Sequence, residues 1–343
     1  MKFEAVTIKD IAKALGLSTS TISRALRDSY EISAATKKMI LDYAKKINYE
    51  PNPIALSLKE RKSHTIGVVV GEIANSFFSQ AIDGIESVAN QNDYTVIISQ
   101  SHENFDKEIV SIRQLTSRSV DGLLLSVSAE TNNYNYLKEL STKGLPIVFF
   151  DRIVNEINTH KVIVDNYKGA YEATEHLIKN GCKNIFALAN VAFLSITKER
   201  LAGYKAALFD YGIKFNPKLI YHCKPSELFT PKNEQAVKKI LKQNPKPDGI
   251  LGLSDQLTTG CIKLLKKEKI KVPKDIKVIG FSNNELTDIL QPSLSIIKQP
   301  AFEMGKIATQ LLLNLIESKR PISEFITTVL KSELIVREST GLK

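Results

Sequence analysis

The stretch from Thr7 to Leu26, TIKDIAKALGLSTSTISRAL, constrains this chain more than any other part of it. Its apolar residues recur at i, i+3, i+4 and i+7, which places them on one face of a first helix: Ile8, Ile11, Ala12 and Leu15. Thr7 and Asp10 have the spacing of a capping box at the start of that helix. Gly16 predicts its end, because glycine adopts the left-handed conformation after a helix without steric cost.

A second helix is predicted directly after this turn, with Ser18 as its N-cap. The predicted buried stripe consists of Ile22, Ala25 and Leu26, and the opposite face carries Ser20, Ser23, Arg24 and Arg27. Small hydroxyls approach base edges closely, and arginine donates two hydrogen bonds to guanine, so this face suits the DNA major groove. The alternative is an ordinary capped helical hairpin in an unrelated helical domain.

Charge is concentrated near this helix pair. The 343 residues are enough for two or three domains. Residues 1–62 contain 12 Lys or Arg and seven Asp or Glu, so half of the formal net charge of +10 lies in less than a fifth of the chain. That asymmetry indicates a polyanionic partner at this end, although a generally lysine-rich composition would also produce it.

The cysteines and the apolar runs indicate the cellular setting. Cys182, Cys223 and Cys261 are far apart and form no Cys-x-x-Cys motif, so we expect reduced thiols and neither disulfides nor a metal site. The N-terminal residues lack the apolar segment of a signal peptide, and no run approaches the roughly 18 apolar residues of a membrane span. We therefore expect a cytoplasmic protein with no membrane partner, no metal and no cofactor.

A third helix and a linker are predicted to follow. Residues 33–47 have a helical apolar stripe and complete a three-helix DNA-binding domain over residues 1–50. The Pro51 and Pro53 positions interrupt helix, because proline disfavours the helical conformation in the residue before it. IALSL at 54–58 and the charged run at 59–62 then form a predicted hinge helix and linker over residues 51–63.

From residue 64 to 340, short apolar runs alternate with amphipathic segments, a pattern typical of parallel sheets covered by helices on both faces. Strands are predicted at 66–70, 95–99, 122–127, 146–150, 161–164, 184–189, 249–253 and 277–281. Helices are predicted at 80–91, 107–117, 170–180, 198–211, 235–243 and 259–268. The pattern restarts near Val162, which predicts one subdomain of about 64–161 and 292–322 and another of about 162–291 and 323–340. Doubly wound sheets bind ligands at the carboxyl ends of their strands, so a ligand is expected between the subdomains.

Many further motifs stand in one order along the chain: INYEPNPIALSL, TIGVVV with NSFF, SVDGLLL, VFFDR, VDNYKGAYEATEHLI, RLAGYKAAL, LGLSDQ, VPKDIKVIGF, LSIIKQPAFEMGKIA and ELIVREST. Together with the helix pair they resemble the lactose-repressor/galactose-repressor (LacI/GalR) family of bacterial regulators over essentially the whole length. The resemblance implies an all-α helix-turn-helix head and an α/β periplasmic-binding-protein-like core of two doubly wound parallel-sheet subdomains. It further implies a homodimeric transcription regulator, most simply a repressor, that binds pseudo-palindromic double-stranded operator DNA and a small effector, a sugar or sugar derivative.

The resemblance also assigns roles in DNA binding. It implies base contacts by Thr19, Ser20 and Arg24. Contacts to the DNA backbone are implied for Thr7, Ser18, Thr21, Ser23 and Arg27; such contacts set the position on DNA rather than its sequence preference. The implied hinge contacts are Asn52, Ala55 and Leu58. Leu58 matches a leucine wedged between base steps in the minor groove, with helix packing as the alternative.

For the effector, the resemblance implies eight binding residues: Phe77, Phe78, Asp151, Arg152, Arg200, Ser254, Asp255 and Ser282. Phe77 and Phe78 either pack on the ligand or are simply buried. Asp151 and Arg200 either hold sugar hydroxyls or pair with each other as a salt bridge. Ser282 stands where an acidic residue is usual, and Gly71-Glu72 where Pro-Asp is common. The identity of the effector is therefore the property that can least directly be inferred from the family.

Other functional classes find less support in the sequence. The chain has no Gly-x-Gly-x-x-Gly, no phosphate-binding glycine-rich loop, no Gly-x-Ser-x-Gly elbow and no His-Glu-x-x-His, so it is not expected to be an enzyme. A DNA recombinase would need an activated nucleophile, and a sugar-transport protein would need a signal peptide. A cytoplasmic sugar-binding protein, or a regulator that responds to a nucleobase or a protein co-regulator, remains the alternative. The effector's identity, its direction of action and the operator sequence are left open.

Overall fold

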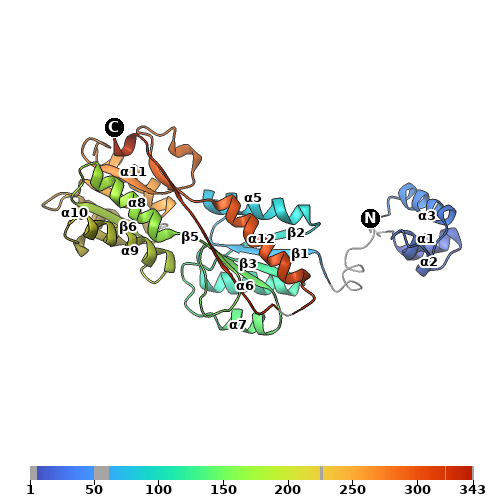
Figure 1. The fold of residues 1–343 in the computed structure, drawn as a ribbon. Helices are drawn as coiled ribbons and strands as arrows, with labels where there is room; N and C mark the ends of the chain where they lie inside the picture. The colour runs from blue at the N-terminus through green and yellow to red at the C-terminus, as the bar shows by residue number, and fades with distance from the viewer. Residues whose placement is uncertain (1–5, 50–61, 225–226, 321, 342–343) are drawn as a thin grey trace. The chain divides into compact units, whose positions relative to one another are not determined.

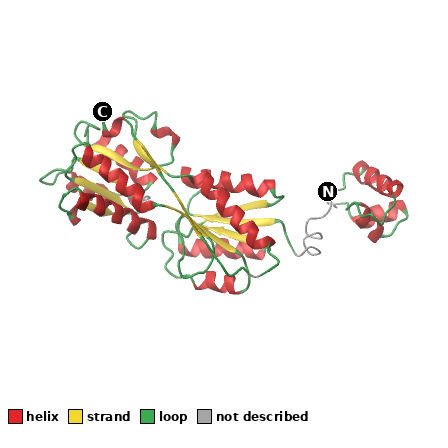
Figure 2. Cartoon of the chain, in the orientation of Figure 1, coloured by secondary structure: helices red, strands yellow, loops and turns green. Residues whose placement is uncertain are grey.

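The computed structural model describes residues 6–49, 62–224, 227–320 and 322–341. The chain divides into two compact units, residues 1–64 and residues 65–343 (Figures 1 and 2). None of the described helices is both long enough and apolar enough to cross a bilayer.

The first unit contains the three predicted helices, α1 (Ile8–Leu15), α2 (Thr19–Ala25) and α3 (Ala34–Lys46). Their caps form as predicted. The Asp10 carboxylate accepts from the Thr7 backbone N–H at 2.8 Å, Gly16 has φ +65°, and Ser18 Oγ accepts from the Thr21 N–H at 3.0 Å. The predicted apolar stripes meet in one core that contains Ile11, Ala12, Ile22, Ala25, Ile40 and Ala44.

The second unit contains two sheets, each in its own subdomain. The first sheet has the order β11-β5-β4-β3-β1-β2 and is parallel throughout. Its strands are β1 (Thr65–Val70), β2 (Thr95–Gln100), β3 (Gly122–Leu125), β4 (Ile147–Phe150), β5 (Lys161–Val164) and β11 (Thr327–Leu330). Helices α5 (Ser76–Gln91) and α12 (Ala301–Glu317) pack on one face, and α6 (Phe105–Ser117) and α7 (Asn135–Thr142) on the other. The near-continuous burial of the inner strands β1, β3, β4 and β5 is what a sheet covered on both faces requires.

The second sheet has the order β12-β10-β9-β8-β6-β7 and is parallel except for β12, which runs antiparallel to β10. Its strands are β6 (Ile185–Ala189), β7 (Ile220–His222), β8 (Gly249–Gly252), β9 (Lys277–Phe281), β10 (Ser295–Lys298) and β12 (Glu333–Ile335). Helices α8 (Asn166–Lys179) and α9 (Ser195–Asp210) cover one face, and α10 (Pro231–Leu241) and α11 (Asp255–Lys267) the other. Short 3₁₀ helices lie at Pro217–Leu219, Glu285–Thr287 and Glu338–Thr340.

The predicted boundaries between the subdomains are wrong at three strands. The predicted boundary cut through β5, and the prediction placed β10 in the first subdomain and β11 in the second. In the structure, β5 and β11 both belong to the first sheet, and β10 belongs to the second. The chain consequently crosses between the sheets three times, after β5, after β10 and after β11 (Figure 1). Periodicity indicates that a segment is a strand, but the sheet it joins depends on pairing with strands distant in sequence.

Most helices begin two to four residues earlier than predicted. Helix α5 begins at Ser76 rather than at residue 80, because the Asn75 side chain accepts from the Phe77 N–H at 2.9 Å and caps the turn. Asp165 caps α8 in the same way, accepting from the Lys168 N–H at 2.9 Å. These starts depend on the polar capping residues, which the apolar period alone does not mark. Strands β7, β10, β11 and β12 were not predicted.

Helices α5 and α12 lie side by side on the first sheet and touch through their backbones (Figure 1). A Cβ atom on Gly305 would lie 2.0 Å from the carbonyl oxygen of Ala81, and one on Gly84 would lie 2.0 Å from that of Phe302. Two glycines, one on each helix, thus permit a separation that no side chain would allow.

Replacing Gly305→Ala should therefore destabilise the second unit, although alanine favours helix over glycine by about 1 kcal/mol. The added methyl meets backbone atoms that cannot rotate away, and we expect a loss of about 1–3 kcal/mol or more in the free energy of unfolding. Denaturant unfolding measures it. The control is Gln310→Ala, an exposed position on the same helix, which should change stability by less than about 0.5 kcal/mol. A stabilised Gly305→Ala variant would contradict the close contact.

Candidate functional site

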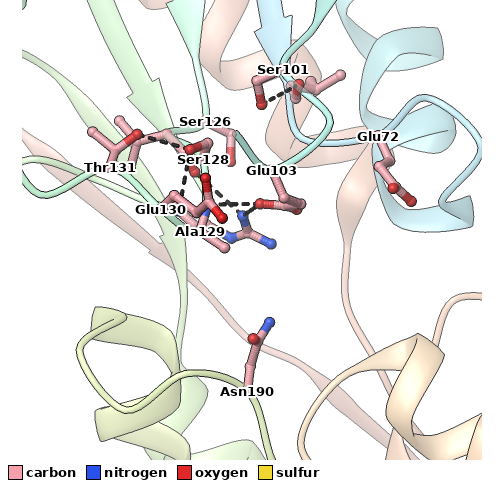
Figure 3. A network of polar contacts seen from close by, with 12 residues as sticks. Glu72, Ser101, Glu103, Ser126, Ser128, Ala129, Glu130, Thr131 and Asn190 are labelled. Atoms are coloured by element: carbon pink, nitrogen blue, oxygen red, sulfur yellow. Dashed lines mark hydrogen bonds and ion pairs between the residues drawn. The ribbon is translucent and has the colours of Figure 1, made fainter. Parts of the chain in front are cut away.

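A cavity of about 120 Å³ lies between the two subdomains at the carboxyl ends of their strands. Its lining follows seven strands: β1, β2, β3 and β4 of the first sheet and β6, β7 and β8 of the second. The lining residues are Glu72, Asn75, His102, Glu103, Ala129, Arg152, Asn190, Lys224, Ser254 and Gln256. In Figure 3, Asn190 from the second subdomain faces the loops of the first across this space. Ligand sites of doubly wound folds occupy this position, as the sequence predicts.

Arg152 is the most constrained charge at the cavity. Only 8% of the residue is exposed, and its Nη1 lies 2.5 Å from Glu103 Oε2 and 3.4 Å from the carbonyl oxygen of Val127. Its Nε lies 3.8 Å from Asp151 Oδ2. Burial opposes the charge, but the Glu103 carboxylate outweighs this effect, so the pKa of Arg152 lies above its ordinary value. The guanidinium is therefore permanently charged and already paired.

Glu103 reaches Arg152 through an unusual loop after β2. His102 and Glu103 both have positive φ, at +51° and +58°, a conformation that side chains rarely adopt. The same carboxylate accepts from the Ala129 N–H at 2.7 Å (Figure 3). A Cβ atom on Gly71 would lie 2.2 Å from Glu103 Oε1, so the glycine found where the family commonly has proline leaves room for this carboxylate.

A buried carboxylate, Glu108 on α6, helps to hold the loop after β3. It accepts hydrogen bonds from the Ser128 N–H, from Thr131 Oγ1 at 2.8 Å and from the Tyr136 hydroxyl. Burial raises the pKa of Glu108, although these bonds partly offset the shift. Its bonds to Ser128 and Thr131, on either side of Ala129, help to hold the loop that brings Ala129 to the cavity.

Asp151 and Arg200 are buried, but they do not pair with each other among the ion pairs of the described residues. Arg200 donates to Asn166 Oδ1 at 2.8 Å and to the carbonyl oxygen of Leu253 at 2.7 Å, and its guanidinium lies 3.7 Å from the centre of the Phe281 ring. Burial lowers the pKa of Arg200 to about 10. Burial also raises the pKa of Asp151, partly offset by Arg152. The predicted alternative of a salt bridge between them is therefore wrong.

Asp255 and Ser282, both predicted at the ligand, are bonded to each other. The Ser282 hydroxyl donates to Asp255 Oδ1 and accepts from the Asn284 N–H at 3.2 Å. Burial raises the pKa of Asp255, and the bond from Ser282 partly offsets this. The serine that replaces the usual acidic residue thus avoids placing two carboxylates against each other.

Of the eight predicted effector residues, Arg152 and Ser254 line the cavity. Phe77 and Phe78 instead pack edge to face in the core of the first subdomain, with ring centres 5.3 Å apart, as their burial alternative predicts. Sequence reasoning missed Glu72, Asn75, His102, Glu103, Ala129, Asn190, Lys224 and Gln256. Each lies a few residues after the end of a strand, so the rule about carboxyl ends, applied strand by strand, would have found them.

Side chains also bond across the cavity and join the subdomains. Lys224 Nζ lies 2.5 Å from Glu130 Oε1, and Gln256 Nε2 donates to Glu72 Oε2 at 3.0 Å. Away from the cavity, Gln80 and Asn283 exchange two hydrogen bonds of 3.1 and 2.7 Å. The described arrangement is consequently a closed one, in which each subdomain satisfies polar groups of the other.

Some buried polar atoms have no hydrogen-bond partner among the described residues. They include Arg152 Nε, Ser254 Oγ and Gln299 Nε2. An unsatisfied buried polar atom costs about 1–3 kcal/mol, so such atoms are normally paired with a ligand or with water. Arg152 and Ser254 also line the cavity, on opposite subdomains.

On the helical head, the three residues predicted to contact bases, Thr19, Ser20 and Arg24, are exposed on α2. Arg24 Nη1 lies 3.1 Å from Glu31 Oε2, with about half of each side chain exposed. Residues predicted to contact the DNA backbone are partly engaged with each other. Arg27 donates to the Ser23 carbonyl oxygen and hydroxyl at 3.0 and 2.9 Å, and Ser18 Oγ lies 2.7 Å from Ser20 Oγ and 2.8 Å from Thr21 Oγ1. The predicted hinge contacts, Asn52, Ala55 and Leu58, lie outside the described residues.

Known proteins resemble the chain over nearly its whole length. Residues 7–52 match the model of bacterial regulatory proteins of the lacI family, and residues 63–333 match that of periplasmic binding proteins and the sugar-binding domain of the LacI family. The HTH-type transcriptional regulator RegA of Clostridium saccharobutylicum is 33% identical, covering 98% of this chain and 99% of RegA. The ribose operon repressor of Halalkalibacterium halodurans is 30% identical, covering 97% of each chain.

Solved structures resemble the fold as well. The lac repressor dimer bound to operator and the anti-inducer ONPF has a TM-score of 0.83 at 23% identity, covering 99% of this chain and 100% of that one. A LacI family regulator from Enterococcus faecium with bound ribose has a TM-score of 0.69 at 28% identity, covering 81% of this chain and 100% of that one. The predicted fold class is confirmed. The chain belongs to the LacI family of DNA-binding transcription regulators, with a helix-turn-helix head and a periplasmic-binding-protein-like core.

Proposed function

We propose that this protein is a cytoplasmic repressor that binds a pseudo-palindromic operator as a homodimer and is controlled by a sugar or sugar derivative bound between its core subdomains. The observation that carries the proposal is the cavity at seven strand ends, where Arg152 Nε and Ser254 Oγ are buried without a hydrogen-bond partner among the described residues. These two atoms lie on opposite subdomains, so one ligand that bonds to both would bias the relation between them.

The chemistry of the lining favours a polyol. Carboxylates accept hydrogen bonds, the amides of Asn75, Asn190 and Gln256 donate and accept them, and a sugar hydroxyl does both. A nucleobase would instead need a ring or an apolar face to stack on, and His102 is the one ring among the described lining residues. The ribose-bound regulator and the ribose operon repressor among the relatives support a carbohydrate.

The helix-turn-helix head is the part of the protein that binds DNA in this proposal. We propose that Thr19, Ser20 and Arg24 contact bases, while Thr7, Ser18, Thr21, Ser23 and Arg27 contact phosphates, with Leu58 of the hinge wedged into the minor groove. The dimer is supported by the operator-bound lac repressor dimer that the fold resembles. Two heads on one dimer would read half-sites of a pseudo-palindrome. The family membership and the helical head disfavour a sugar-binding protein without a DNA target.

Ligand and DNA binding should be coupled. An effector that changes the relation between the subdomains changes the placement of the hinges, and a coupling of about 1–3 kcal/mol alters DNA affinity about 5–150-fold. The proposal therefore requires that one ligand both stabilise the core and change operator affinity.

We expect a thermal-shift screen of the full-length protein to find a stabilising sugar, since a ligand at 100 times its dissociation constant adds about 2.7 kcal/mol to the free energy of unfolding. Ser254→Ala should weaken this stabilisation without destabilising the ligand-free protein, because the hydroxyl has no hydrogen-bond partner among the described residues. Ser117→Ala, an exposed serine on α6, is the matched control. A sugar that stabilises the protein but leaves affinity for a selected operator unchanged would refute its role as effector.

Arg24→Ala should relax sequence preference at one operator position, with a loss of about 1–3 kcal/mol of discrimination there, because a base contact is sequence-specific. Arg27→Ala, a proposed phosphate contact, should weaken binding evenly across sequences and reduce the salt dependence. Binding to a library of operator variants at two salt concentrations separates the two. An even loss for Arg24→Ala would assign it to the DNA backbone, and undiminished operator binding by a variant lacking residues 1–62 would overturn the whole assignment.

A further inference from the structure

Both cations that line the cavity already have a carboxylate partner. Arg152 Nη1 lies 2.5 Å from Glu103 Oε2 and its Nε lies 3.8 Å from Asp151 Oδ2, while Lys224 Nζ lies 2.5 Å from Glu130 Oε1. Glu72 adds a further carboxylate to the lining, where its described hydrogen bond comes from the neutral amide of Gln256. Among the described residues, the wall of the cavity thus contains no cation whose charge is left for a ligand to neutralise.

Glu103 is held in this position by several independent contacts. Its backbone is in the left-handed region, its carboxylate accepts from the Ala129 N–H at 2.7 Å, and Gly71 leaves the space that it occupies. Burial opposes ionisation of Glu103, but the charge and hydrogen bond of Arg152 prevail, and the pKa of this carboxyl lies below its ordinary value. The pair is present at neutral pH as two full charges.

The pair determines which ligand charge the cavity tolerates. A phosphate or carboxylate on the ligand could bind Arg152 only by displacing Glu103 or by lying beside it, and Glu72 would repel it as well. Hydroxyl groups, in contrast, can donate to Glu103 and accept from Arg152 Nε, which has no hydrogen-bond partner among the described residues, without breaking the pair.

We propose that Glu103 is a built-in counter-anion that sets the charge selectivity of the cavity: it keeps Arg152 neutralised, so that uncharged polyols bind and phosphorylated or carboxylated sugars are excluded. This inference rests on the proposed function, since it assumes that the cavity is the effector site. It narrows the ligand class and assigns a selectivity-determining role to a residue after β2.

The test compares full-length wild type and Glu103→Gln by calorimetric titration with ribose, glucose, ribose 5-phosphate and glucuronate at neutral pH and low salt. The glutamine retains an acceptor for Arg152 and for the Ala129 N–H but removes the negative charge. We expect wild type to show no binding of either anionic sugar, and Glu103→Gln to bind at least one of them at least tenfold more tightly than wild type. That gain should shrink as salt is added.

Two further variants test whether anion binding is gained because Arg152 loses its carboxylate partner or only because the cavity loses a negative charge. Glu72→Gln removes one negative charge from the same cavity without unpairing a cation, so it should gain much less anion binding. The double variant Glu103→Gln/Arg152→Gln should lose the gain of the single variant. Two results would overturn the role of Glu103. One is that Glu72→Gln gains as much anion binding as Glu103→Gln, and the other is that the double variant without Arg152 keeps the gain.

Thermal unfolding would reveal whether Glu103→Gln fails to fold. In that case, the binding of neutral and anionic sugars by the wild type alone tests the inference. Tighter binding of an anionic sugar than of its neutral counterpart by wild type would refute the inference, while leaving a sugar-controlled regulator intact. Binding of the neutral sugar alone would support it. If wild type bound no sugar but Glu103→Gln still gained anion binding, the charge selectivity would stand and the proposed carbohydrate effector would fail.

Discussion

Three crossings of the backbone between the two sheets hold the carboxyl ends of seven strands around one cavity. Parallel strands make this arrangement possible, because all their carboxyl ends lie at one edge of the sheet, where the loops can diverge without disturbing the core. The crossings after β5, β10 and β11 return the chain to the first sheet for α12 and β11 before it ends in the second subdomain with β12. A change in the relation between subdomains is therefore confined to a few connecting residues, the usual property of a hinge.

Within this frame, the cavity combines satisfied charges with unsatisfied dipoles. The ion pairs of Arg152 and Lys224 neutralise the cations, while Arg152 Nε and Ser254 Oγ have no described hydrogen-bond partner. In a site of this kind, a ligand gains binding affinity from hydrogen bonds rather than from its charge. Lys224 bonds to Glu130, and Gln256 bonds to Glu72, across the cavity. A ligand in the cavity could replace these bonds between the subdomains with bonds to itself.

Much of the local structure was predictable. The capping box of Thr7 and Asp10, the left-handed Gly16 and the three apolar stripes of the head depend on residues a few positions apart, and all form as expected. The same holds for eight of the strands, because continuous apolar runs between polar loops leave little alternative. Prediction failed for the assignment of β5, β10 and β11 to sheets and for most of the cavity lining, since both depend on partners far away in sequence.

The sequence by itself determined the helix-turn-helix head, the alternation of strands and helices and the family to which both belong, because these follow from local periodicity and from motifs in a fixed order. Only the tertiary structure decided that Phe77 and Phe78 are core residues, that Ser282 bonds Asp255, and that Glu103 reaches Arg152 across 49 positions of sequence. Gly71 illustrates the difference. In sequence it is a departure from a common proline, and in the fold it is the space that admits a carboxylate.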